Sequence, residues 1–182
     1  VVEPEDLGEL KMYVWSGDPQ SERAWRAAGF DVVPTASSDV LQGLQTGRLE
    51  AFATVPLYAL ASQWFALAPH MLAVKWSPLA GATVVKKDVW EKIDPALREK
   101  LKKIAAEETE ASRAEIRKMG QKAIAAMKDR NLEVVDPGPE VVAKWRAAAQ
   151  KAYPVIEGKV VPEAMFDRVQ KLLEDYRAKK GG

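Results

Sequence analysis

The stretch that decides the fold of this 182-residue chain reads Leu10-Lys11-Met12-Tyr13-Val14-Trp15-Ser16-Gly17-Asp18-Pro19. Residues 10–15 are mostly apolar and aromatic, which is typical of a short strand. Asp18 is a preferred N-cap residue and Pro19 suits the first helical position, so we expect a helix to begin there. Gly29 is expected to end that helix. The stretch therefore predicts a strand that leads directly into a helix.

The same alternation continues through the first half of the chain. Further strands are expected at residues 30–33, 50–54, 70–76 and 80–85. Two helices are expected between these strands. The first begins at a cap formed by Ser37, Ser38 or Asp39 and ends at Gly47. The second begins at Pro56 and runs through Trp64 and Phe65. Strands and helices that alternate in this way predict an α/β fold with a mainly parallel sheet. In such sheets, ligands bind at the loops beyond the carboxyl ends of the strands.

The second half of the chain is helical in pattern. After Pro95, the chain contains no further proline up to residue 131 and only Gly120 as glycine, and the apolar positions keep a helical period. A helix of that length spans about 54 Å, so we expect it to reach out of its own domain, with a kink near Gly120. A short strand at 132–135 and further helices follow. The expected division is a leader at 1–9, an α/β ligand-binding lobe at 10–93, the long spanning helix at 94–131, a C-terminal strand and helices at 132–178, and a disordered tail at 179–182.

Composition and motifs argue against several classes of function. Lys and Arg number 27 against 26 Asp and Glu, so the net charge of +1 gives no basic excess for nucleic acid. Cysteine is absent, and His70 is the one histidine, which leaves no typical zinc site. Neither a G-x-S-x-G nucleophile elbow nor a phosphate-binding glycine motif is present. We therefore expect no catalytic site, no metal and no cofactor.

Aromatic side chains at predicted strand ends are the candidates for ligand contact. Tyr13 and Trp15 are two residues apart on one strand and so face the same side of the sheet. Trp76 closes a later strand. Aromatic residues with a few polar groups are the usual lining of a small-molecule pocket. The alternative for each residue is that it simply packs in the core.

Several segments, in order, resemble the solute-binding subunit of tripartite ATP-independent periplasmic (TRAP) transporters, the DctP-like family. Residues 10–14 resemble the family's LKxRV strand, and residues 29–34 are similar to its GAxPVP strand. Residues 38–47 resemble SEVYxALQTG and precede an acidic residue, Glu50. Residues 76–78 resemble YSP, and the segment from Lys87 to Pro95 resembles KDVWxxLPP. The ordered series is more specific than any one of these motifs.

The resemblance implies a two-lobed periplasmic protein that closes around a small solute, often a carboxylate, and delivers it to membrane subunits. Members of the family are longer than this chain, so we expect that the first lobe is missing and that this chain supplies the second lobe and the C-terminal helices. The chain starts at Val1 without a signal peptide, which we expect to have been removed. A lone lobe exposes its hinge and cleft surfaces, which predicts a homodimer through one of them.

The sequence departs from the family at its solute-binding positions. Tyr13 stands where the resemblance implies an arginine that clamps a carboxylate, and Thr54 stands near an expected asparagine, with Val55 as an insertion. A tyrosine can stack and can donate one hydrogen bond, but it carries no positive charge. We therefore expect an aromatic or more apolar solute, or an organic acid held through other groups. The candidate ligand-binding residues are Tyr13, Trp15, Asp18, Phe52, Thr54, Pro56 and Trp76.

Two other functions remain open on the sequence. One is a helical protein-interaction module with the α/β half as scaffold, because residues 95–131 and 162–178 form long amphipathic patterns. The other is an enzyme that uses carboxylates such as Asp18, Asp39 and Glu50. Asp18 and Asp39 stand at predicted helix starts, where capping explains them better.

Overall fold

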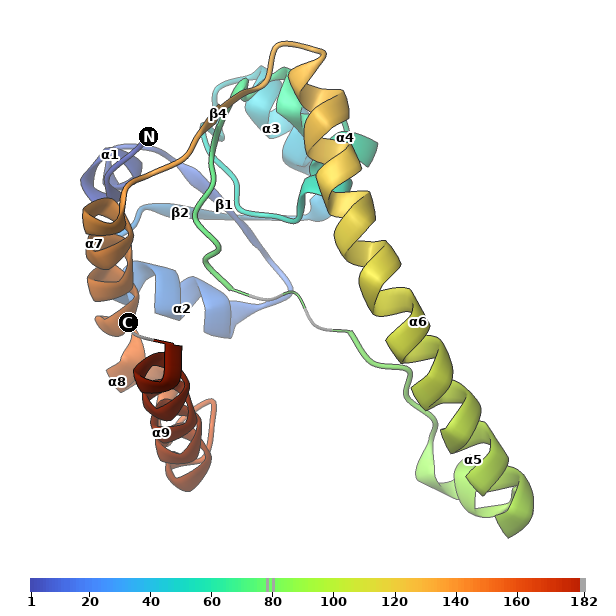
Figure 1. Ribbon diagram of the computed structural model, residues 1–182. Helices are drawn as coiled ribbons and strands as arrows, with labels where there is room; N and C mark the ends of the chain where they lie inside the picture. The colour runs from blue at the N-terminus through green and yellow to red at the C-terminus, as the bar shows by residue number, and fades with distance from the viewer. Residues whose placement is uncertain (78, 80, 181–182) are drawn as a thin grey trace.

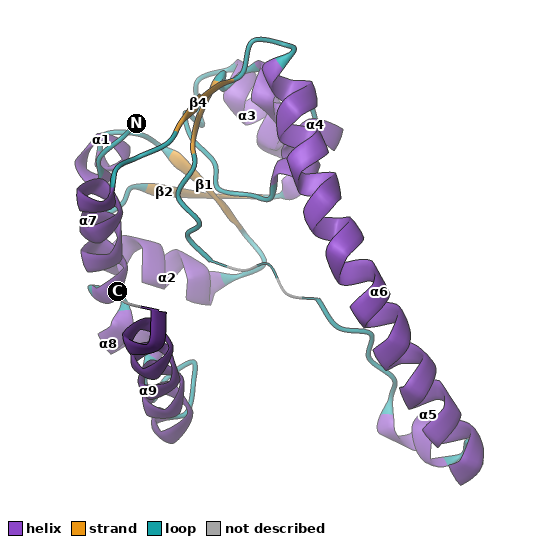
Figure 2. Cartoon of the chain, in the orientation of Figure 1, coloured by secondary structure: helices purple, strands orange, loops and turns teal. Residues whose placement is uncertain are grey.

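Parallel strands form the centre of the first half of the molecule, which we describe from a computed structural model that covers residues 1–77, 79 and 81–180. Strand β1 (Met12–Trp15) pairs in parallel with β2 (Val32–Thr35), so that Met12 lies opposite Val32 and Trp15 opposite Thr35. Figure 1 shows the arrangement of these elements, and Figure 2 shows the short strands in orange among the purple helices. The expected parallel α/β architecture is confirmed.

The expected third strand at residues 50–54 is reduced to a single bridge on the other side of β1. The Tyr13 N–H donates to the Ala51 carbonyl at 2.8 Å, and the Glu50 N–H donates to the Lys11 carbonyl at 2.9 Å. Pairing ends there, because the chain turns into helix α4 (Pro56–Ala61), whose first residue has no N–H to donate. β1 therefore lies between two parallel neighbours.

The helix after β1 begins and ends where the sequence predicts. In α2 (Pro19–Ala27), Asp18 Oδ1 accepts hydrogen bonds from the N–H groups of Gln20 and Ser21 at 3.2 and 3.0 Å. Gly29, with φ of +99°, follows the last turn. The Phe30 N–H then donates to the Trp25 carbonyl, which satisfies a group that the helix end would leave unpaired. Local capping signals thus set both ends of α2.

The predicted helix through Trp64 and Phe65 is interrupted. α4 ends at Ala61, Gln63 adopts a left-handed conformation with φ of 58°, and a short 3-10 helix, η2 (Trp64–Ala66), follows. The change of direction at Gln63 allows Trp64 and Phe65 both to be buried. The preceding predicted helix is also divided, into η1 (Ser37–Asp39) and α3 (Val40–Gln45).

A second pair of parallel strands lies apart from the first. Strand β3 (His70–Leu72) pairs with β4 (Glu133–Val135), so the predicted strand at 132–135 is confirmed and the one at 70–76 is shorter than expected. The predicted strand at 80–85 is wrong for residues 81–85, which have no regular structure; Ala80 and Pro78 lie outside the described residues. The structure offers residues 81–85 no neighbouring strand, and their side chains are exposed, so nothing stabilises an extended conformation.

Helix α6 (Pro95–Lys128) is the long helix that the sequence predicts. Its 34 residues, at about 1.5 Å each, give it a length of about 51 Å, and it continues unbroken through Gly120. Asp94 caps its first turn by accepting from the N–H groups of Ala96 and Leu97. Ala123 and Met127 are its buried residues. α5 (Lys87–Glu91) lies beside the amino end of α6, and the C-terminal helices lie on the opposite side of the molecule (Figure 1).

The N-terminal segment packs against helix α7 (Pro139–Gln150) in the second half of the chain. Residues expected as a leader form helix α1 (Pro4–Gly8), and the indole N–H of Trp145 in α7 donates to the Val2 carbonyl at 2.8 Å. Helices α8 (Tyr153–Ile156) and α9 (Glu163–Lys180) follow. α9 runs through Lys180, and residues 181–182 lie outside the described part of the chain. The disordered tail at residues 179–182 stays a prediction.

Three clusters of buried residues hold these elements. The first joins β1 and β2 to α7, with Met12, Val32 and Trp145 among its members. The second packs α4 against the last turns of α6, and the third surrounds Trp64. Within the described residues, no helix combines the length and apolarity needed to cross a bilayer. The division at residues 10–93, 94–131 and 132–178 stays a prediction.

Candidate functional site

The carboxyl edge of the first parallel strands carries a group of aromatic rings around Trp64. Trp64 is 3% exposed, and its ring lies 5.6 Å from that of Tyr13, 5.4 Å from that of Phe52 and 5.2 Å from that of Tyr58, each in a near-perpendicular arrangement. Edge-to-face pairs of this kind stabilise one another beyond the area they bury. We call Tyr13, Phe52, Tyr58 and Trp64 the Trp64 group. Tyr13 and Phe52 were predicted from the sequence, whereas Trp64 and Tyr58 were not. The reason is that the predicted helix from Pro56 through Phe65 contained no turn at Gln63.

Tyr13 is held by its hydroxyl as well as by its ring. Its Oη lies 3.1 Å from Ser37 Oγ, which joins β1 to the start of η1. The side chain is half-buried and lies on the face of β1 opposite the buried Met12 and Val14. Either hydroxyl can donate in this pair, and a hydroxyl that donates one hydrogen bond can still accept others.

Trp15 lies at the same edge but faces solvent. Its side chain is 54% exposed, two residues further along β1 than Tyr13. An added Cβ at Gly17 would collide with the indole ring of Trp15, so the ring lies over the backbone of the following loop. A large exposed aromatic ring next to the Trp64 group offers a flat apolar surface at the strand ends.

Asp18 acts as a helix cap in this structure. Besides the two backbone N–H groups on Oδ1, the Ser21 hydroxyl donates to Asp18 Oδ2 at 2.6 Å. The hydrogen bonds from the Ser21 hydroxyl and N–H lower the pKa of Asp18. Because both carboxylate oxygens are engaged within α2, we do not include Asp18 among the residues proposed to contact a solute.

We expect the Asp18→Ala protein to lose about 1 kcal/mol of unfolding free energy at neutral pH. Because the folded state lowers the pKa of Asp18, its stabilising effect is present above the unfolded pKa of about 3.9 and is lost as the pH falls through the folded pKa. Urea unfolding at several pH values measures this. Asp18→Asn, which keeps a cap acceptor, should retain most of the stability without that pH dependence; an equal loss in both variants at neutral pH would contradict the capping role.

The remaining predicted residues fall into two places. Thr54 is exposed, and Val55 and Pro56 form the N-cap and first position of α4, so this segment borders the Trp64 group. Trp76 is elsewhere: it stacks on Trp25, with ring centres 4.8 Å apart and planes 13° apart, and packs against the first core cluster. The structure therefore brings Tyr13 and Phe52 together around Trp64 and leaves Trp76 in a different aromatic group.

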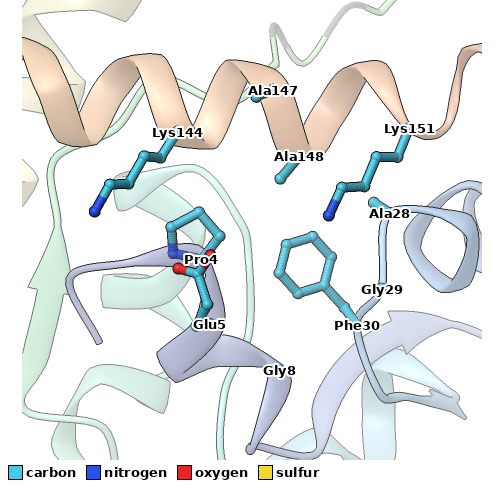
Figure 3. Close-up of a pocket in the computed structure, with 10 residues that line it drawn as sticks. All are labelled: Pro4, Glu5, Gly8, Ala28, Gly29, Phe30, Lys144, Ala147, Ala148 and Lys151. Carbon is cyan, nitrogen blue, oxygen red and sulfur yellow. The ribbon is translucent and has the colours of Figure 1, made fainter.

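A shallow depression of about 260 Å³ lies between α1 and α7 (Figure 3). Phe30 and Ala148 contribute to its apolar lining, and Lys144, Lys151 and Glu5 contribute charged side chains. The Lys144 ammonium forms an ion pair with Glu3 at 3.1 Å, which raises the pKa of Lys144. Because its lining carries both signs of charge and Lys144 is already paired with Glu3, this depression offers no clear charge preference to a ligand. It also contains none of the residues predicted from the sequence.

These features define a class of protein. Parallel strands present aromatic and hydroxyl groups at their carboxyl ends, and the described residues contain no cluster of three or more metal-ligating acidic or histidine side chains. Such an edge is where parallel α/β proteins bind small molecules, so these features place the chain in the class of α/β small-molecule-binding proteins.

The particular family follows from sequence comparison. Residues 1–159 match the model for bacterial extracellular solute-binding protein, family 7, and the chain belongs to this DctP family. The family is one of extracellular solute-binding proteins, and the protein is periplasmic. The predicted resemblance is confirmed.

Individual relatives agree with this assignment. The chain is 29% identical over 126 residues to a C4-dicarboxylate-binding periplasmic protein of Rhodobacter capsulatus, covering 69% of this chain and 38% of that protein. A TRAP periplasmic solute-binding protein from Ochrobactrum anthropi superposes with a TM-score of 0.80 at 16% identity, covering 98% of this chain and 55% of the other. One from Xanthobacter autotrophicus with bound β-D-galacturonate gives 0.76 at 16% identity, covering 94% and 55%. At these identities the two structures show the fold, and the chain spans about half their length.

Proposed function

We propose that this chain supplies one lobe of a TRAP-type periplasmic binding protein and that its solute binds at the carboxyl edge of β1 and β2, against Tyr13, Trp15, Phe52 and Thr54. The observation that carries the proposal is the Trp64 group, which holds Tyr13 and Phe52 in fixed positions beside the exposed Trp15. Pro56 contributes by fixing the start of α4 next to Thr54. Rigid aromatic side chains lose little conformational entropy when a ligand binds, which favours affinity.

The chemistry of this edge favours a solute with an aromatic or apolar body. Tyr13 supplies a ring and a hydroxyl where the family pattern has a carboxylate-binding arginine. The Rhodobacter capsulatus relative is named as a C4-dicarboxylate-binding protein, and the Xanthobacter autotrophicus structure contains bound β-D-galacturonate, a sugar acid. An acidic group on the solute is therefore consistent with the family. We propose that this solute is a small organic acid or aromatic compound whose ring or apolar part packs on Trp15, and that any acidic group is bound by residues other than Tyr13.

We also propose a second part of the solute site and a transport partner, neither of which lies within residues 1–182. Because the solved relatives are about twice as long, we propose that a first lobe outside residues 1–182 closes over this edge. Apolar side chains of α6 are exposed to solvent: Leu97, Ile104 and Ile116 are 49%, 54% and 63% exposed. Their exposure supports the proposal that another part of the protein, such as the first lobe, packs against this helix. The membrane subunits of a TRAP transporter are the proposed recipients of the solute.

We expect Trp15→Ala to weaken solute binding by the full-length protein about three- to tenfold, the range of one lost aromatic contact. The measurement is calorimetric titration with a panel of C4 dicarboxylates, sugar acids and aromatic acids. Because Trp15 is exposed, the variant should unfold at the same urea concentration as the parent, which separates binding from folding. Tight binding of a C4 dicarboxylate that Trp15→Ala leaves unchanged would overturn the proposed solute class.

The exposed apolar positions of α6 and α9 favour a second reading, a surface for protein contact. On α9, Met165, Val169 and Leu172 are 50%, 52% and 59% exposed. The homodimer expected through an exposed hinge or cleft surface stays a prediction. Light scattering at several concentrations of the 182-residue chain distinguishes a dimer, whose apparent mass rises with concentration, from a monomer of 20.1 kDa.

A further inference from the structure

A groove separate from the Trp64 group lies between α7 and the extended segment after β3. We call it the α7 groove; it has a volume of about 300 Å³, and the lining residues that matter here are Lys75, Trp76, Val142, Trp145, Arg146 and Ala149. Residues 142, 145, 146 and 149 recur at helical spacing, so one face of α7 forms one wall. The opposite wall comes from the segment that contains Lys75 and Trp76.

The aromatic part of the α7 groove is held rigidly. Trp76 stacks on Trp25 and meets Trp145 nearly at right angles, with ring centres 5.6 Å apart and planes at 87°. Trp145 in turn stacks on Phe30 at 5.9 Å, and its indole N–H donates to the Val2 carbonyl. These contacts fix both indoles before any ligand arrives, which lowers the entropic cost of binding.

The charged side chains that line the α7 groove are all positive. Lys75 and Arg146 are both exposed, and among the described residues that line the groove none is acidic. A guanidinium matches a carboxylate with two parallel hydrogen bonds, and an ammonium adds a point charge. The groove therefore combines aromatic walls, the apolar side chains of Val142 and Ala149, and two cations at its rim.

We propose that the α7 groove binds a small aromatic carboxylate, with the ring against Trp76 and Val142 and the carboxylate on Arg146 and Lys75. A volume of about 300 Å³ is at the lower end of the range for ligand pockets, which suits a single ring rather than a larger compound. This site stands apart from the proposed solute edge at Trp15, so it does not depend on the solute class assigned there.

The test uses the 182-residue chain, labelled with ¹⁵N, and benzoate as the probe. The indole N–H signal of Trp76, identified by its loss in Trp76→Phe, should shift in a saturable manner as benzoate is added. Benzyl alcohol, which keeps the ring without the charge, and cyclohexanecarboxylate, which keeps the charge without aromaticity, should each bind at least several-fold more weakly. Equal binding of either compound would overturn the assignment to aromatic carboxylates.

Two variants test the site itself, each with a matched control. Arg146→Gln should weaken benzoate binding about tenfold, as expected for one lost charge-assisted hydrogen-bonded contact, whereas Lys118→Gln on the exposed part of α6 should have no effect. Ala149→Leu should fill the groove and abolish the shift, whereas Ala147→Leu, exposed on the same helix, should retain it. Backbone amide signals far from α7 report that each variant is folded. Benzoate binding that survives both Arg146→Gln and Ala149→Leu would overturn the proposal, as would the absence of any saturable shift.

Discussion

Replacing Trp64 with alanine is expected to lower the free energy of unfolding by about 3–5 kcal/mol. Trp64 is 3% exposed, and the rings of Tyr13, Phe52 and Tyr58 pack against it within 5.6 Å. Removing the indole leaves a cavity that these three side chains cannot fill without losing their edge-to-face contacts. Urea unfolding followed by circular dichroism measures the loss.

A second tryptophan at the same edge is the control for this prediction. Trp15 is 54% exposed, so Trp15→Ala removes little buried surface and should cost less than about 1 kcal/mol. Trp64→Phe, which keeps an aromatic ring, should lie between the two. Similar stabilities for Trp64→Ala and Trp15→Ala would mean that Trp64 does not organise this edge, and the proposed solute site would then lack its support.

Replacing Met127 with alanine is expected to cost about 2–5 kcal/mol. Met127 is 1% exposed near the carboxyl end of α6, where it packs in the cluster that contains Ala59, Phe65 and Leu132. This cluster attaches the last turns of α6 to α4, whereas residues 99–119 of the same helix are exposed. The loss of Met127 should therefore loosen the attachment of the whole 34-residue helix.

Met119 provides a matched control on the same helix. It is 39% exposed, eight residues before Met127, so Met119→Ala changes helix propensity by the same amount without opening a buried cavity. We expect Met119→Ala to change stability by less than about 0.5 kcal/mol in the 182-residue chain. Hydrogen exchange of the α6 amides distinguishes local loosening from global unfolding. A cost for Met119→Ala as large as that for Met127→Ala would contradict this account of how α6 is attached.

Elements whose ends depend on nearby residues could be predicted from the sequence. Asp18-Pro19 and Asp94-Pro95 start α2 and α6 because the capping carboxylate bonds to N–H groups two and three residues away, which no distant contact has to supply. Gly29 ends α2 for the same local reason. The ordered motifs also identified the family, which the match to residues 1–159 confirms.

The length of each strand and the contacts between aromatic rings, in contrast, depend on long-range packing that the sequence pattern does not show. Residues 50–54 and 70–76 share the strand-like pattern of residues 10–15, but each pairs only where a neighbouring strand lies within hydrogen-bonding reach, so one became a bridge and the other a short strand. Tyr13 and Trp76 likewise looked equivalent at strand ends. Trp64 contacts Tyr13 because the chain turns at Gln63, and Trp145 contacts Trp76 because of the way α7 packs. Such contacts join residues far apart in the chain, so they depend on how whole helices pack.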